Sequence, residues 1–229
     1  MILDLAGGLQ RLADVDQPLE IEVGCGRGHF AVAQAAAHQD HCIVACELKS
    51  DRCRSTLERA RCTNVDNVLV VKTRGEELLR QIRPRSVAII HIYFPDPWPK
   101  TRHRRRRLFR WDHLAAMVAA LELGGEIRFA TDFADYGLQA RVLTALHPQL
   151  RTERKSAFDT RSLSRYGPRL EALGKTIVHL TATRIATSPT DDQKQALLDM
   201  LDRSPYRETQ QQHYPEHVHR QRHGDQHAR

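Results

Sequence analysis

The pattern of apolar and polar positions predicts strands and helices that follow one another along most of the chain. Short apolar runs rich in β-branched residues predict buried strands at residues 19–23, 41–46, 67–71, 88–94 and 126–130. Stretches with helical spacing or helix-forming composition predict helices after His29, over Asp51–Arg61 and over Asp112–Leu123. Gly124 and Gly125 are expected to end the last of these helices. Alternating strands and helices of this kind predict an α/β fold around a mostly parallel sheet.

The last third of the chain changes character. Residues 150–154 are interpreted as an edge strand, and the alternation over Thr176–Ile185 indicates a last, antiparallel strand. From Thr187 onward the composition is polar, with a short helix expected at Asp191–Leu201 and a stretch rich in Gln, His and Arg after it. We therefore expect a folded domain over residues 1–186 and a polar tail over residues 187–229, disordered after its helix. Irregular spacing of the tail histidines favours disorder over a metal site.

The most unusual stretch begins where the strand at 88–94 ends. Two prolines cannot extend a parallel strand, so Pro95-Asp96-Pro97 must turn and hold an acid at the strand's carboxyl end. Trp98 follows, and seven Lys or Arg residues lie between Lys100 and Arg110. Ligands of open α/β sheets bind at this end of the strands. An acid, an aromatic ring and many cations together indicate a site for a base on a phosphate-rich polymer. The alternative is a proline-terminated strand followed by a solvated basic helix.

A second motif follows the first predicted strand. Glu22 precedes a glycine turn with Gly24, Gly26 and Gly28, and a helix-forming run comes next. Glycines in such a strand–turn–helix unit let the backbone approach a nucleotide-like ligand. The third glycine comes two residues after the second, unlike the spacing in dinucleotide-binding folds. Glu47 ends the second predicted strand, where a carboxylate can accept hydrogen bonds from both hydroxyls of a ribose.

Charge agrees with a polymeric, anionic partner. The 229 residues include 35 Lys and Arg against 28 Asp and Glu, a formal net charge of +7, and 41% of the residues are hydrophobic. The tail from Thr187 carries six basic and seven acidic residues, so the excess of positive charge belongs to the folded part. This distribution is what a nucleic-acid surface requires, although a merely basic soluble protein would share it.

The central stretch also carries a resemblance to a known family. Its residues 95–100 (PDPWPK), with Arg102-His103 and Arg106-Arg107-Leu108, resemble the signature of bacterial tRNA (guanine-N7)-methyltransferases. The resemblance extends over residues 19–185. It implies a class I methyltransferase fold with a seven-stranded, mostly parallel sheet, helices on both faces and a reversed last strand. It further implies that S-adenosylmethionine is the methyl donor and that N7 of a guanine in the tRNA variable loop is the acceptor.

The resemblance also assigns roles to residues of this chain. Asp96 is the expected catalytic residue, and the cofactor-binding set is Glu22, Gly24, Gly26, Gly28, Glu47 and Asp96. The substrate-binding set is Lys100, Arg102, Arg104, Arg105, Arg106, Asp132, Ser164, Tyr166 and Arg169. Asp132 as a helix cap is a rival interpretation for that residue. No metal is expected.

Two positions depart from the family pattern. Arg74 stands where relatives have an acid or amide that reaches the adenine, and an arginine cannot accept a hydrogen bond. Either Glu76 takes that part or the backbone alone holds the adenine. Gly167 stands where relatives have a glutamate that helps to hold the guanine. These losses motivate one alternative, a tRNA-binding homologue with weak or lost activity. A methyltransferase for another nucleic acid is a further alternative.

Localisation is inferred from cysteines and from hydropathy. Five cysteines without a CxxC pair predict reduced thiols in the cytoplasm and argue against a zinc site. No stretch has the length of a membrane span, and the first ten residues lack the features of a signal peptide. We expect a cytoplasmic monomer or homodimer that binds tRNA and no membrane.

Overall fold

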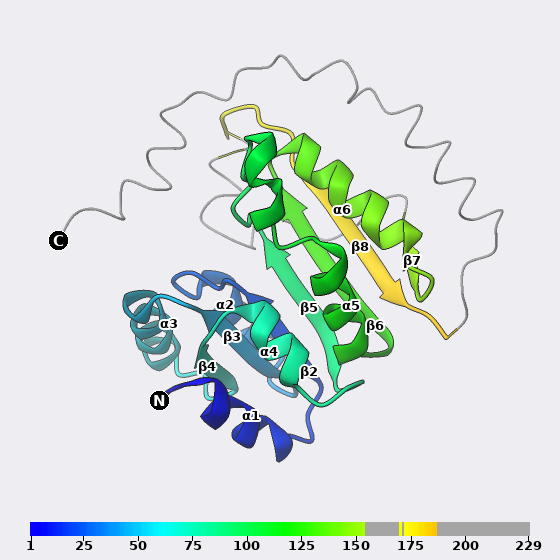
Figure 1. Ribbon diagram of the computed structural model, residues 1–229. Helices are drawn as coiled ribbons and strands as arrows, with labels where there is room; N and C mark the ends of the chain where they lie inside the picture. Colours follow the sequence, from blue (N-terminus) through cyan, green and yellow to red (C-terminus); the bar gives the residue numbers. More distant parts are fainter. Residues whose placement is uncertain (154–169, 171, 187–229) are drawn as a thin grey trace.

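An eight-stranded sheet organises the protein (Figure 1). The computed structural model describes residues 1–153, 170 and 172–186. Across the sheet the strands follow the order β1-β4-β3-β2-β5-β6-β8-β7. Their bounds are β1 Ile2–Leu3, β2 Leu19–Val23, β3 Cys42–Glu47, β4 Val68–Lys72, β5 Val87–Tyr93, β6 Leu121–Thr131, β7 Leu150–Thr152 and β8 Val178–Arg184. The strands from β1 to β6 pair in parallel, whereas β8 runs antiparallel to both β6 and β7. The α/β class, the mostly parallel sheet and the reversed last long strand are thereby confirmed.

Helices cover both faces of the sheet (Figure 1). They are α1 Leu5–Ala13, α2 His29–Ala37, α3 Ser50–Cys62, α4 Gly75–Gln81, α5 Trp111–Ala120 and α6 Ala134–Leu146, with a 3-10 helix, η1, at Thr101–Arg106. Successive residues of β3 and β4 feed different cores, because side chains along a strand alternate between its faces. Val44 and Val71 join the large core under α1, α4, α5 and α6, whereas Ile43 and Val70 join the small core under α2 and α3.

The sheet has one strand more than the seven expected. Ile2 and Leu3 form β1, which pairs in parallel with Val70 and Val71 of β4 at the edge of the sheet. Helix α1 follows at once and was not predicted either, although the Asp4 side chain caps it by accepting from Gly7 N at 2.8 Å. Gly8 lets α1 approach β4 closely, because a Cβ there would lie 2.8 Å from a methyl of Val71.

The predicted helix over Asp112–Leu123 is wrong at its carboxyl end. Helix α5 stops at Ala120, and Leu121 already belongs to β6, where it pairs with Val87. The next pair is Glu126 with Ile89, so β6 bulges over the intervening residues. Gly124 has a φ of +82°, and a Cβ on Gly125 would lie 3.0 Å from carbonyl oxygens of Val87, Ala88 and Glu122. The two glycines therefore permit a bulge within the sheet rather than a helix stop.

Because the strands pair in parallel, the loops that carry the candidate residues lie together at the carboxyl ends of the strands. Glu22 lies beside both Ala45 and His91, and Tyr93 lies beside Ala130. The glycine turn, Glu47, the Pro95–Pro97 turn and Asp132 consequently all follow the carboxyl ends of neighbouring strands. Among the described residues, none of the helices has the length and apolar character to cross a membrane.

Candidate active site

The glycine turn after β2 borders open space. Gly24 and Gly26 have φ values of +76° and +57°, which glycine adopts without the steric cost that a Cβ brings. A Cβ built on either glycine would meet no atom within 4 Å. Gly28 differs, because a Cβ there would lie 2.4 Å from Thr56 Cγ2 on α3. Gly24 and Gly26 thus form an open cradle, whereas Gly28 lets α2 pack closely on α3.

Glu47 fixes this cradle from the end of β3. Its Oε2 accepts from Gly26 N at 3.1 Å, and its Oε1 accepts from the backbone N–H groups of Leu48 and Lys49 at 2.9 and 3.0 Å. Arg52 adds a longer ion pair at 3.6 Å. The carboxylate therefore lies beside the cradle at the position predicted for a ribose-binding acid, and it also holds the loop in place.

Glu22 lies beneath the cradle rather than in it. The residue is buried, and its Oε2 accepts from Ala31 N, in the first turn of α2, at 3.1 Å. Burial raises the pKa of Glu22 to about 8; the hydrogen bond from Ala31 opposes this rise and the charge of Glu47 adds to it. Glu22 is thereby placed to position the start of α2 and the glycine turn.

The raised pKa of Glu22 predicts a pH-dependent stability. In the folded state Glu22 stays protonated up to about pH 8, whereas in the unfolded state it ionises near its ordinary pKa of 4.5. The stability that this protonation contributes is therefore fully present below pH 4.5 and is lost as the pH rises toward 8. The loss is at most about 1.4 kcal/mol per pH unit. Glu22→Gln cannot ionise and should remove this slope. Urea unfolding at pH 5 and pH 8 measures it, with Glu58→Gln, on the exposed face of α3, as control. If the free energies of unfolding of wild type and Glu22→Gln differed by the same amount at pH 5 and pH 8, the raised pKa of Glu22 would be contradicted.

The Pro95–Pro97 turn is bounded by two strained residues. Phe94 and Trp98 have φ values of +48° and +42°, a left-handed conformation that bulky side chains rarely adopt. Each costs on the order of 1–3 kcal/mol, and such strain clusters at functional sites. Phe94 N donates to Ala130 O at 2.8 Å, which ties the start of the turn to β6. The turn thus presents Asp96 in a fixed conformation that the surrounding structure maintains.

Arg107 holds the other end of this turn from inside the protein. The residue is fully buried, and its Nε donates to Pro97 O at 2.8 Å. Its terminal nitrogens donate to Gln139 Oε1 at 2.6 Å and to Asp135 Oδ2 at 2.7 Å, and its guanidinium lies over the Tyr136 ring. Its burial keeps Arg107 from the phosphate contacts that its place in the run of arginines would suggest. Arg107 is a positioning residue for the turn that carries Asp96.

The arginines before Arg107 lie on the surface. Those exposed on η1 are Arg102, Arg104, Arg105 and Arg106, and Lys100 just before them is exposed too. Arg104 pairs with Asp135 at 2.7 Å, and the guanidinium of Arg106 lies 5.0 Å from the Trp98 ring centroid. The structure therefore gathers five of the predicted substrate-binding residues in one exposed, positively charged segment next to Asp96.

Asp96 and Asp132 follow neighbouring strands. Asp96 is exposed, and none of the described residues donates a hydrogen bond to its carboxylate. Burial raises the pKa of Tyr136 to about 12, and the charge of Asp96 adds to the rise. Asp132 is buried, and α6 begins after Phe133 without a side-chain cap. Asp132 therefore lies one residue before the N-cap position of α6, and its interpretation as a helix cap stays a prediction.

The residues that depart from the family pattern are placed only in part. Arg74 is exposed at the start of α4, and its neighbour Gly75 packs so closely on Val23 that a Cβ would lie 2.3 Å from that side chain. Arg74 therefore lies close to the glycine turn. Ser164, Tyr166, Gly167 and Arg169, like the predicted helix at Asp191–Leu201 and the rest of the tail, lie outside the described residues.

Solved structures with the same architecture are methyltransferases. A 16S rRNA (adenine(1408)-N(1))-methyltransferase mutant from Catenulisporales acidiphilia, crystallised with its cosubstrate SAM, gives a TM-score of 0.51 at 17% identity, over 82% of this chain and 95% of that one. The antibiotic-resistance methyltransferase Kmr gives a TM-score of 0.52 at 18% identity, over 80% and 94%. At this identity the likeness concerns the fold. The sheet order, the reversed β8 and the glycine turn at the ends of the strands define a class I methyltransferase fold.

Sequence comparisons narrow the class to a family. The family model described as "Putative methyltransferase" matches residues 16–180. The tRNA (guanine-N(7)-)-methyltransferase of Nocardioides sp. is 32% identical over 181 residues, 79% of this chain and 71% of that protein. The enzyme of the same name from Geobacter metallireducens is 38% identical over 122 residues, 53% of this chain and 58% of that protein. The counterpart from Syntrophotalea carbinolica is 36% identical over 120 residues, 52% of each protein.

The chain belongs to this methyltransferase family, as the central stretch predicted. The match spans a little more than half of the Geobacter and Syntrophotalea relatives.

Proposed function

We propose that this protein transfers a methyl group from S-adenosylmethionine to N7 of a guanine in tRNA, in the variable loop. The observation that carries the proposal is the strained turn after β5, the neighbour of β2, which presents an exposed Asp96 shortly before an exposed row of arginines. Its relatives with this activity in their names support the same reaction. A tRNA substrate also agrees with the expected cytoplasmic location.

The glycine cradle fits the methyl donor. Gly24 and Gly26 leave open space above their backbone, and Glu47 at the end of β3 is suited to accept from a ribose. The N-terminus of α2, which Glu22 helps to position, follows directly. Arg74 cannot accept a hydrogen bond from the amino group of the adenine, so either Glu76 or the backbone would have to accept it. When bound, S-adenosylmethionine supplies an electrophilic methyl group on a sulfonium.

The reaction needs alignment rather than a base. Guanine N7 already carries a lone pair, so no residue has to remove a proton before attack. Well-oriented reactants gain roughly 7–11 kcal/mol over free ones, which is enough for most of the acceleration. The Asp96 carboxylate is suited to accept from guanine N1–H and N2–H, or from the methionine ammonium, and its fixed turn makes it a positioned acceptor. Asp132, which follows the neighbouring strand β6, is suited to a second contact with the guanine.

The exposed arginines suit the tRNA backbone. Phosphate contacts dominate the affinity of nucleic-acid complexes and make it dependent on salt. Arg102, Arg105 and Arg106 are exposed, and none of the described carboxylates forms an ion pair with them. Arg104 shares Asp135 with Arg107, so part of its charge is already compensated. Trp98 is half-buried between Arg106 and His103, an arrangement that serves packing of the turn and leaves stacking on a base open.

Replacing Arg102, Arg105 and Arg106 together by alanine tests this proposal. We expect weaker tRNA binding, with a salt dependence flattened by up to three phosphate contacts, each worth about 0.7–0.9 in the log–log slope. Transfer of a labelled methyl group at saturating tRNA should change much less. Arg54→Ala with Arg61→Ala, on the exposed surface of α3, removes positive charge elsewhere and serves as control. Equal effects of the two sets would contradict the assignment of η1 to tRNA binding.

A further inference from the structure

A turn at the amino ends of the strands, on the side of the sheet opposite the candidate active site, holds three side chains with metal-ligand chemistry. His38 is the C-cap residue of α2, and Asp40 and His41 precede β3. One ligand atom from each of these three residues lies within 4.8 Å of the other two. His38 and Asp40 are exposed, and His41 is partly exposed, so an ion has access from solvent. Two imidazoles and a carboxylate are a ligand set that Zn²⁺ accepts, with water in a fourth position.

The orientation of His41 supports this interpretation. Its Nδ1 lies 2.5 Å from Oε1 of the fully buried Glu20, so its Nε2 is the nitrogen left for an ion. That Nε2 lies 3.9 Å from Asp40 Oδ2. A metal-bound histidine commonly has its other ring nitrogen on a carboxylate, which fixes the ring and makes it a better ligand. Glu20 is itself held by His91 Nε2 at 2.6 Å and by Gln34 Nε2 at 2.9 Å.

The backbone of the turn is also fixed before any ion binds. The side-chain amide of Asn67 donates to the carbonyl oxygens of His38 and His41 at 2.9 and 3.0 Å. His41 N donates to His38 O at 3.1 Å, which closes the turn. Both imidazoles therefore project from backbone positions that a single side chain ties together, and an ion would have little conformational freedom to remove.

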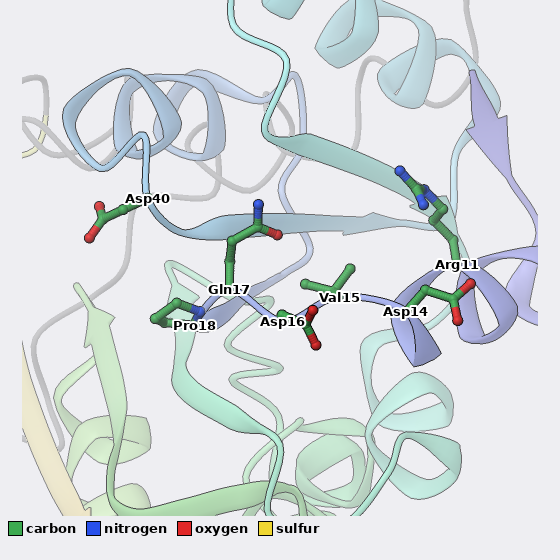
Figure 2. A pocket seen from close by; sticks show the side chains of 7 residues that line it. All are labelled: Arg11, Asp14, Val15, Asp16, Gln17, Pro18 and Asp40. Atoms are coloured by element: carbon green, nitrogen blue, oxygen red, sulfur yellow. The ribbon is translucent and has the colours of Figure 1, made fainter.

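The surroundings of the turn are acidic. Asp40 borders a hollow of about 540 Å³, whose walls also include Asp14 and Asp16 and one cation, Arg11 (Figure 2). Carboxylates that outnumber cations raise the local concentration of positive ions. This surface lies at the carboxyl end of α2 and the amino ends of the strands, away from the glycine cradle and from the row of arginines.

We propose that His38, Asp40 and His41 bind one divalent transition-metal ion of the Zn²⁺ class, with Glu20 orienting His41. No metal was expected from the sequence, because its cysteines form no CxxC pair and its tail histidines are irregularly spaced. The ion would clamp the end of α2 to the start of β3. Through Glu20 and His91 the clamp would extend to β5, where His91 Nδ1 lies 2.8 Å from the Tyr93 hydroxyl.

The test uses the full chain with its five tail histidines, at 213, 217, 219, 223 and 227, replaced by glutamine, since these would bind metal themselves. Zn²⁺ is titrated by calorimetry, thermal unfolding is followed with and without one equivalent, and the visible absorption of bound Co²⁺ reports the ligand geometry. We expect one equivalent of Zn²⁺ to bind and to raise the melting temperature. His38→Ala and Asp40→Ala should each weaken binding by about tenfold or more and abolish the thermal shift.

The matched control is Gln39→Ala, an exposed change in the same turn that removes no ligand. It should bind Zn²⁺ as the parent does. Glu20→Gln should weaken binding by about 10–100-fold, as loss of a carboxylate behind a ligating histidine does. Absence of stoichiometric binding in the parent would overturn the proposal, as would His38→Ala and Asp40→Ala variants that bind Zn²⁺ like Gln39→Ala.

Discussion

Replacing Asp96 by alanine is expected to lower methyl transfer by about 10²-fold or more while the fold and the affinity for tRNA persist. An unpaired donor on a buried guanine edge costs about 1–3 kcal/mol, and misalignment of the reacting atoms by about 1 Å adds up to a further 10²-fold. The stability should change little, because Asp96 is exposed and no described residue donates a hydrogen bond to its carboxylate. The strained turn is held instead by Phe94 N and by Arg107.

Turnover at saturating tRNA, tRNA affinity and melting temperature, measured together, separate this role from a structural one. Asp66→Ala, an exposed aspartate before β4, serves as the control for removal of one surface carboxylate. If Asp96 merely stabilises the turn, Asp96→Ala would lower the melting temperature and leave the turnover of the folded protein normal. A wild-type rate for Asp96→Ala would show that the turn does not contribute its acid to the reaction.

Replacing Arg107 by alanine is expected to have the largest effect on stability, a loss of about 3–5 kcal/mol in the free energy of unfolding. Removal of one member of a buried ion pair costs about this much, because its partners lose their hydrogen bonds without access to water. Here the partners include Pro97 O, Gln139 and Asp135. Asp135 is partly exposed and regains some solvation, which places the expected loss nearer the lower end.

Urea unfolding of Arg107→Ala and of Arg105→Ala provides the measurement. Arg105 is two residues away and exposed, so its replacement should change the free energy of unfolding by no more than about 0.5 kcal/mol. Arg107→Lys keeps the charge but loses the planar fork that reaches several acceptors, and it should rescue only part of the loss. Similar stabilities of Arg107→Ala and Arg105→Ala would contradict the role given to Arg107.

Much of the fold followed from hydrophobic patterning. The buried parallel strands are short apolar runs bounded by glycine, proline or charge, and their carboxyl ends carry the residues that the motifs had singled out. Arg107 could not be distinguished in this way, because it is the last of four consecutive arginines and nothing in the run shows which one faces inward. Its burial depends on where Asp135, Gln139 and Tyr136 lie, and these belong to α6, about 30 residues later.

Two glycine pairs explain the errors in the fold. Helix α1 was not predicted, because Gly7 and Gly8 have a low helix propensity. Gly8 is nevertheless needed where α1 contacts Val71. Gly124 and Gly125 were interpreted as a helix stop, whereas they form the bulge in β6. In both cases the same dipeptide serves close packing of backbone against a neighbouring strand. That requirement arises only in the assembled sheet and cannot be read from local propensity.

The most direct test of the proposed function is to map the methylated nucleotide. Purified protein is incubated with S-adenosylmethionine and unmodified tRNA, and the RNA is then cleaved chemically at N7-methylguanine. The proposal predicts cleavage at one guanine in the variable loop, dependent on both protein and cofactor, and its loss with Asp96→Ala. The absence of cleavage in every tRNA tested would contradict the proposal.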